Sequence, residues 1–270
     1  KRQDRNRTSP FAFTGNKFEF RMLGSSASVA TPNIVLNTAV AEALAQFYQE
    51  LEGTKPEDME HAVHELLKRA IRKHKKIIFN GNGYSEEWVK EAESRGLYNL
   101  ISTPDCLPQF IVEKNVDLFT KHHIFTKDEI FSRYEILLEN YVKTILIEAR
   151  TLSEMLTKDF LPAVSAFAGQ TAKNAASKKA FLPTLSMPAE EALVTKLTKT
   201  YTDLTDGLTQ LADLVREAES IDDMQKEAEF CHTQILSRME ALRLTANAAE
   251  TLIPDTLLPY PTYDQLLFSL

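Results

Sequence analysis

The sequence predicts a mainly helical fold that begins with one short β segment. Apolar residues recur at intervals of three and four over residues 193–215 and 224–246, the spacing of amphipathic α-helices. Residues 17–21 instead alternate between polar and apolar, which is typical of a strand with one face in the core. Helix caps and prolines divide the region between these segments. We therefore expect a short β segment followed by a bundle or hairpin of helices.

The β segment carries three charged residues on one face. In residues 17–21 the two phenylalanines would face the core, and the opposite face would hold Lys17, Glu19 and Arg21. A Gly-Asn turn signal separates this strand from a possible partner strand at residues 11–13.

Local start and stop signals place the helices of the first half of the chain. A helix is expected over 33–51, after Thr31 and Pro32, and Pro56 opens a second one. A short helix that carries Trp88 follows the cap residue Ser85, and residues 96–110 are expected to form an irregular connector. The capping-box pair Thr126 and Glu129 then opens a long helix from about Lys127 towards Phe160.

The second half predicts a helical hairpin. Pro183 and Pro188 mark a loop, and the apolar stripes 193–215 and 224–246 follow it. Because the two stripes are joined by a short connection, we expect antiparallel helices. The tail, residues 254–270, is expected to be extended and to pack on the bundle.

Composition excludes several classes of protein. The chain has 270 residues and a net charge of −7, which disfavours a nucleic-acid partner. It contains neither an apolar run long enough to cross a membrane nor a signal peptide, and its two cysteines suit a reducing compartment. We expect a cytoplasmic protein. The charged start without an initiator Met suggests a piece of something larger.

The charged strand face suits a nucleotide-and-metal site. A carboxylate such as Glu19 can ligate a hard divalent cation, Arg21 can hold an anionic group in bidentate fashion, and Lys17 offers a point charge to a phosphate. On spacing alone, a solvated charged face is the simpler alternative.

Longer motifs resemble the type III branch of the glutamine synthetases. They are Asn-Arg-Thr-Ser-Pro-Phe-Ala-Phe over 6–13, Gly-Asn-Lys-Phe-Glu-Phe-Arg over 15–21, Ala-Thr-Pro-Asn over 30–33, Asn-Gly-Asn-Gly-Tyr-Ser over 80–85, Ser-Arg-Tyr-Glu over 132–135 and Pro-Thr-Tyr over 261–263. The resemblance implies that residues 1–125 are the end of the catalytic domain and that 126–270 form a helical C-terminal domain.

The resemblance also implies roles for single residues. Glu19 matches the family's metal-binding glutamate, and Arg21 matches the arginine that stabilises bound glutamate and its phosphorylated form. Arg7 matches the substrate- and phosphate-contacting arginine of the Asn-Arg loop, so Arg7 and Arg21 are the expected catalytic and substrate-binding residues. Lys17 stands where many members have a nucleotide-contacting arginine. A further ATP-contacting arginine of common bacterial members has no match in residues 11–13.

The implied activity is ATP-dependent ligation of ammonia to L-glutamate through γ-glutamyl phosphate, with Mg²⁺ or Mn²⁺ as the metal. The complete protein would be a ring-shaped homo-oligomer, and this portion alone would be inactive because most metal-binding carboxylates lie upstream. The rival hypothesis is a non-catalytic helical interaction or oligomerisation module.

The remaining motifs are better explained by structural roles than by metal binding or catalysis. His61 and His64 lie three residues apart on a predicted helix without an obvious third ligand, and the pair at 122–123 suggests a loop. Neither cysteine has an adjacent base.

Overall fold

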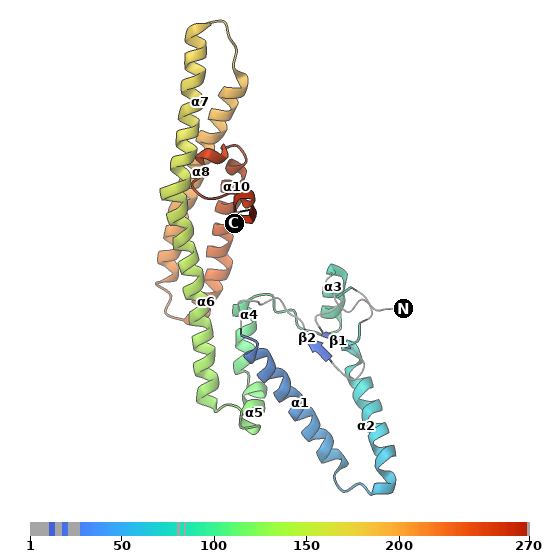
Figure 1. Ribbon diagram of the computed structural model, residues 1–270. Helices are drawn as coiled ribbons and strands as arrows, with labels where there is room; N and C mark the ends of the chain where they lie inside the picture. The colour runs from blue at the N-terminus through green and yellow to red at the C-terminus, as the bar shows by residue number, and fades with distance from the viewer. Residues whose placement is uncertain (1–10, 14–17, 21–27, 80–81, 84, 269–270) are drawn as a thin grey trace. The chain divides into compact units, whose positions relative to one another are not determined.

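The computed structural model describes residues 11–13, 18–20, 28–79, 82–83 and 85–268 (Figure 1). The chain divides into two compact units: residues 1–101 with 108–132, and residues 102–107 with 133–270. Helices dominate both units, which confirms the predicted mainly helical fold. The predicted boundary between a catalytic-domain portion, 1–125, and a helical domain, 126–270, is not the same division and stays a prediction.

Helices and two short strands build the first unit. Its elements are β1 Phe11–Phe13, β2 Phe18–Phe20, α1 Ala30–Leu51, the 3₁₀ turn η1 Pro56–Asp58, α2 Met59–His74, η2 Lys75–Ile77, α3 Glu86–Ser94, η3 Leu107–Ile111, which leads in from the second unit, and α5 Glu113–Lys121. Strands β1 and β2 pair antiparallel, and the register opposes Phe11 to Phe20 and Phe13 to Phe18.

A small core joins α1 and α5 of the first unit to the start of α6, Lys127–Met155. Val116, Phe119 and Ile130 are buried, and Ile34 of α1 packs against them. At the α3 end, Ser85 accepts a hydrogen bond from the Trp88 amide at 3.3 Å, so the predicted cap is confirmed. Helix α5 was not predicted, because most of its sequence is polar and only Val116 and Phe119 of it are buried.

The second unit is an elongated helical bundle. Its elements are α4 Thr103–Cys106, α6 Lys127–Met155, which begins in the first unit, the π-helical turn η4 Leu156–Phe160, α7 Leu161–Phe181, α8 Pro188–Ala218, α9 Met224–Phe230, the π-helical turn η5 Cys231–Ile235, α10 Leu236–Glu250, η6 Asp255–Leu257 and α11 Tyr263–Phe268. Helix α8 packs along α7 and along α10, as Figure 1 shows.

The stripe residues of the predicted hairpin form the centre of this bundle. Leu197, Leu204 and Leu211 of α8 are completely buried, as is Ile235 of η5. The side chains of α6, η4 and α7 complete the same core. The hairpin prediction is therefore confirmed, with the long helix of α6 and α7 added as a third packed segment.

Two boundaries differ from the prediction. The long helix does not end at Phe160 but continues to Phe181, passing Pro162 in the first turn of α7. A proline ring clashes with the carbonyl four residues earlier, here that of Lys158, and the wider π turn at 156–160 relieves this clash. The predicted connector 96–110 contains α4 and most of η3, because Ser102 caps α4 by accepting the Asp105 amide at 3.2 Å.

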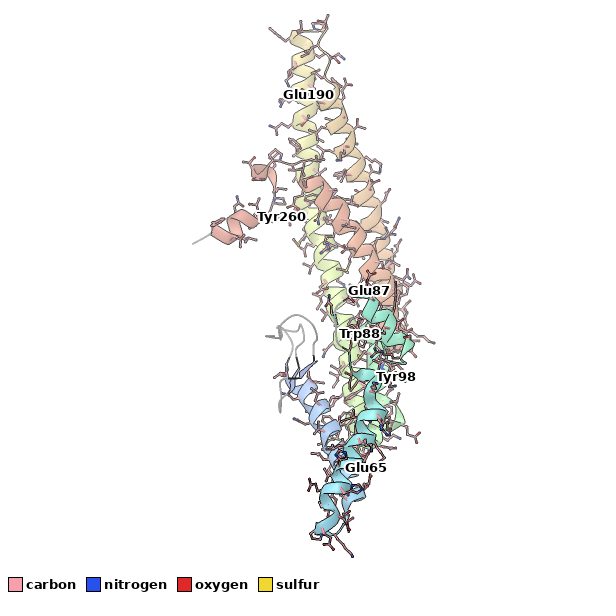
Figure 2. All side chains as sticks on the ribbon, turned by 90° about the vertical axis from the view of Figure 1, so that its right-hand side faces the viewer. Glu65, Glu87, Trp88, Tyr98, Glu190 and Tyr260 are labelled. Atoms are coloured by element: carbon pink, nitrogen blue, oxygen red, sulfur yellow. The ribbon has the colours of Figure 1, made fainter. Side chains whose placement is uncertain are left out.

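The C-terminal tail is partly helical rather than extended. It contains η6 and α11, and Leu257, Leu258 and Tyr260 pack against the bundle core. The Tyr260 ring stacks on that of Phe160, with ring centroids 6.3 Å apart. Figure 2 labels Tyr260 in this tail. The predicted packing of the tail on the bundle is confirmed, whereas its extended conformation is wrong over these two short helices.

A pair of helical glycines gives a direct test of packing in the bundle. A Cβ atom at Gly207 of α8 would lie 2.7 Å from Cδ2 of the buried Leu242, whereas one at Gly169 of α7 would meet nothing within 4 Å. We expect Gly207→Ala to destabilise the protein by about 1–2 kcal/mol, since overpacking outweighs the gain in helix propensity. Gly169→Ala should stabilise it by up to about 1 kcal/mol. Urea unfolding of both variants would measure this, and a stabilised Gly207→Ala would contradict it.

Candidate functional site

Glu19 is the central residue of β2, and its Cα lies opposite that of Ala12 in β1. The other three predicted site residues, Arg7, Lys17 and Arg21, lie outside the described residues. Lys17 and Arg21 directly flank β2 in the chain. The assignment of all four to an active site therefore stays a prediction.

The residues that the structure describes can supply only part of a metal site. They contain no group of three or more His, Cys, Asp or Glu side chains placed to hold an ion. Mg²⁺ takes an octahedral set of oxygen ligands. A carboxylate is the ligand type that such a cation takes, so the predicted role of Glu19 would be that of one ligand among several.

A second polar cluster joins α1 to the end of α5. The Glu42 carboxylate accepts a hydrogen bond from Lys121 Nζ at 2.8 Å and lies 2.7 Å from His122 Nε2. Gln46, one turn along α1, donates to the same carboxylate at 2.8 Å. The side chains of Glu42 and His122 are only 20% and 19% exposed. The cluster therefore links α1 to the end of α5, two segments that are far apart in sequence.

Sequence reasoning placed His122 in a loop and missed this cluster. His122 caps α5, and His123 after it adopts a left-handed backbone with φ of 54°. No local pattern connects residue 42 to residues 121 and 122, so only the packing of α1 on α5 brings them together. His122 also lines an open pocket of about 560 Å³ with Asn33, Asn37 and Thr38 of α1.

We expect the Glu42 cluster to make the first unit sensitive to acid. Hydrogen bonds from Lys121, Gln46 and His122, in that order of size, lower the pKa of Glu42 from 4.5 to about 2. A group whose pKa is lower in the folded state contributes stability above its unfolded pKa. That contribution is lost as the pH falls from about 4.5 towards 2.

We expect Glu42→Gln to reduce the loss of stability between pH 6 and pH 3. Urea unfolding at both pH values, followed by the fluorescence of the single tryptophan, Trp88 of the first unit, measures this loss. Glu65→Gln is the control, because Glu65 lies in the same unit and its pKa is also lowered by Lys68, but this pair is more exposed to solvent. Equal acid sensitivity of Glu42→Gln and the wild type would contradict the assignment.

The two cysteines are free thiols in different settings. Cys231 is buried in the bundle, where desolvation raises its pKa to about 11, while Cys106 is exposed. A thiol with a raised pKa is a poor nucleophile. None of the described helices combines the length and apolar character that a bilayer crossing requires.

Comparison with known proteins finds similarity to glutamine synthetases. The model of the glutamine synthetase C-terminal domain matches residues 62–179, from α2 to the end of α7. The chain is 41% identical over 268 residues to a glutamine synthetase of Butyrivibrio fibrisolvens, covering 99% of this chain and 38% of that protein. The resemblance to glutamine synthetase is confirmed.

Two further glutamine synthetases agree with this match. A type-3 glutamine synthetase of Dictyostelium discoideum is 37% identical over 270 residues, and a glutamine synthetase of Bacteroides fragilis is 31% identical over 272 residues. Both alignments cover 98% of this chain and 37% of the relative. The chain thus spans less than two fifths of these glutamine synthetases and matches a C-terminal portion of the family.

Proposed function

We propose that this chain is the C-terminal portion of an enzyme that ligates ammonia to L-glutamate at the expense of ATP. The observation that carries the proposal is the alignment of nearly the whole chain with glutamine synthetases, at 41% identity to that of Butyrivibrio fibrisolvens. The alignment extends over all but a few residues of the chain, so it is not confined to the helical region. In the proposal, residues 1–125 complete the catalytic domain and residues 126–270 form a separate helical domain.

The proposed reaction has two steps. The side-chain carboxylate of glutamate takes the γ-phosphoryl group of ATP, which forms an acyl phosphate and ADP. Ammonia then attacks the acyl carbon and gives up one proton, and phosphate leaves with the electron pair of the broken C–O bond and takes up a proton. Both steps concentrate negative charge on oxygen atoms, and positioned cations that bind this charge more tightly in the transition state accelerate them.

The proposed roles of this chain's residues follow from the resemblance to glutamine synthetases, and the charge of each residue suits its role. Glu19 ligates a divalent cation, Mg²⁺ or Mn²⁺, which when bound supplies charge neutralisation at the phosphates. Arg21 and Arg7 hold the carboxylate and the transferred phosphoryl group through bidentate hydrogen bonds. Lys17 contacts the nucleotide as a point charge, without the planar fork of an arginine.

We propose that the complete protein is a cytoplasmic homo-oligomeric ring. The two free cysteines support a reducing compartment. The ring rests on the family resemblance, in which neighbouring subunits share each active site. Sedimentation analysis of the complete protein at two concentrations tests it, and a monomer at both would refute it.

The experiment that tests the function is an assay of glutamine formation by the complete gene product, with ATP and ammonium each omitted in turn. We expect formation to require both. The isolated 270-residue chain should form none, since its described residues offer no group of metal ligands. Absence of glutamine formation by a folded complete protein would overturn the proposal and favour the non-catalytic interaction module.

A further inference from the structure

A polar pocket of about 450 Å³ opens between α8 and α10 of the second unit. Helix α8 supplies one wall, and η5 with the start of α10 supplies the other. The lining includes Gln210, Asp213, Leu214, Gln234, Ser237 and Arg238. The volume falls in the range of about 300–1,000 Å³ that is typical of small-molecule sites. Most of these side chains are polar, so the pocket suits a small polar ligand.

Both walls of the pocket belong to a tightly packed pair of helices. Helix α8 packs along α10, as Figure 1 shows. Leu211 of α8 and Ile235 of η5 are completely buried in the bundle core behind the pocket residues. One turn further along, a Cβ atom at Gly207 would lie 2.7 Å from Cδ2 of Leu242, so the two helices are in close contact there. Packed helices hold the groups of a site more precisely than loops do.

Arg238 has a buried donor that nothing satisfies. Its Nε atom is buried without a hydrogen-bond partner, and no ion pair joins Arg238 to any residue that the structure describes. Arg216 and Arg243, on the same two helices, each bind a carboxylate three residues away. An unsatisfied donor on a charged group costs free energy and requires an explanation. The residues three and four positions from Arg238 include no acid: they are Gln234, Ile235, Ala241 and Leu242.

Asp213 places the opposite charge on the α8 wall. Its carboxylate binds Arg216 of its own helix rather than Arg238. The pocket therefore presents a guanidinium on one wall and a carboxylate on the other. A simple anion would be repelled by Asp213 and a simple cation by Arg238, whereas a ligand that carries both charges meets a partner for each.

We propose that this pocket binds a free α-amino acid with a polar side chain. The α-carboxylate accepts hydrogen bonds from the Arg238 guanidinium, and the α-ammonium donates to the Asp213 carboxylate. The side chain of the ligand meets the amides of Gln210 and Gln234 and the hydroxyl of Ser237, which can each donate and accept. None of the four proposed active-site residues lines this pocket. The site does not rest on the proposed function, which only makes L-glutamine, the proposed product, the first ligand to test.

Hydrogen exchange of the complete protein, read by mass spectrometry on peptides that cover 207–214 and 234–241, tests the site. L-Glutamine, L-glutamate, L-asparagine and L-serine are each added in turn. At ten times the Kd of a bound amino acid, exchange in these peptides should slow about 10-fold, because each opening must first release the ligand. No slowing with any of the four at up to about 30 mM, equivalent to a Kd weaker than millimolar, would overturn the proposal.

Ligand analogues test the two charges separately without altering the protein. The α-amide of the bound amino acid lacks the carboxylate, and its N-acetyl derivative lacks the ammonium. Neither should slow exchange at the concentration at which the parent does. Equal slowing by the N-acetyl derivative would mean that the pocket takes any carboxylate and would overturn the assignment of an amino acid.

A pair of arginine variants locates the binding. Arg238→Gln removes the guanidinium and should abolish the slowing in both peptides. Arg243→Gln is the matched control, because Arg243 is also an arginine of α10 but binds the exposed Glu240 outside the pocket. Slowing that survives in folded Arg238→Gln would overturn the proposal. The readout does not depend on glutamine formation, so it fails or succeeds separately from the proposed function.

Discussion

Substitution of Glu19 by alanine in the complete protein should lower glutamine formation by at least about 100-fold, because it removes a direct ligand of the divalent cation in the proposed site. Loss of an outer-shell partner of a metal already costs about 10–100-fold, so loss of a ligand belongs at or beyond the upper end of that range. The ATP-dependent rate at saturating ammonium is the quantity to measure. Raising the Mg²⁺ or Mn²⁺ concentration should recover part of the rate.

The control for Glu19→Ala is Glu148→Ala. Glu148 is an exposed carboxylate on α6, so its removal changes the net charge equally without touching the β hairpin. Circular dichroism of both variants should match that of the wild type. A folded Glu19→Ala variant with undiminished turnover would show that β2 is scaffold and that its charged face has no part in catalysis.

Substitution of Phe160 by alanine should destabilise the helical bundle by about 3–5 kcal/mol, the cost of deleting a large buried side chain and leaving a cavity. Phe160 lies in the π turn between α6 and α7, is 1% exposed and stacks on Tyr260 of the C-terminal tail. The substitution therefore removes contacts both within the bundle and between the bundle and the tail. Urea unfolding followed by far-ultraviolet circular dichroism measures the loss.

Phe181 provides the matched control. It ends α7, twenty-one residues further along the same helical segment, and is 92% exposed. Phe181→Ala deletes the same atoms from the surface and should change the free energy of unfolding by no more than about 0.5 kcal/mol. Similar losses for the two variants would contradict the burial of Phe160 that defines this part of the core.

Local signals predicted the elements that local chemistry controls. The capping box is an example: the Thr126 amide donates to Glu129 Oε2 at 2.7 Å, the Glu129 amide donates to Thr126 Oγ1 at 3.3 Å, and α6 begins at Lys127. Ser85 likewise caps α3 by accepting the Trp88 amide at 3.3 Å. Both partners of each cap lie within three residues, so the sequence contains the whole interaction.

The candidate site depended on a different kind of information. Glu19, Lys17 and Arg21 stand together in the sequence pattern of one strand, and the family resemblance attached a chemistry to them. Their joint action depends on the further ligands of a metal site, and those ligands are not neighbours in sequence. The Glu42 cluster escaped prediction for the same reason. Lys121 and His122 are 79 and 80 residues from Glu42, and no sequence pattern connects them.

The sequence by itself determined the mainly helical class, the two amphipathic stripes and the resemblance to glutamine synthetase, because periodicity, caps and motifs are properties of short stretches of chain. Only the tertiary structure decided that the long helix passes Pro162, that α5 forms, and that Arg238 lies in a polar pocket between α8 and α10. Each of these depends on which side chains from distant segments cover a surface, and the free energy of burial is set by that contact rather than by the residue alone.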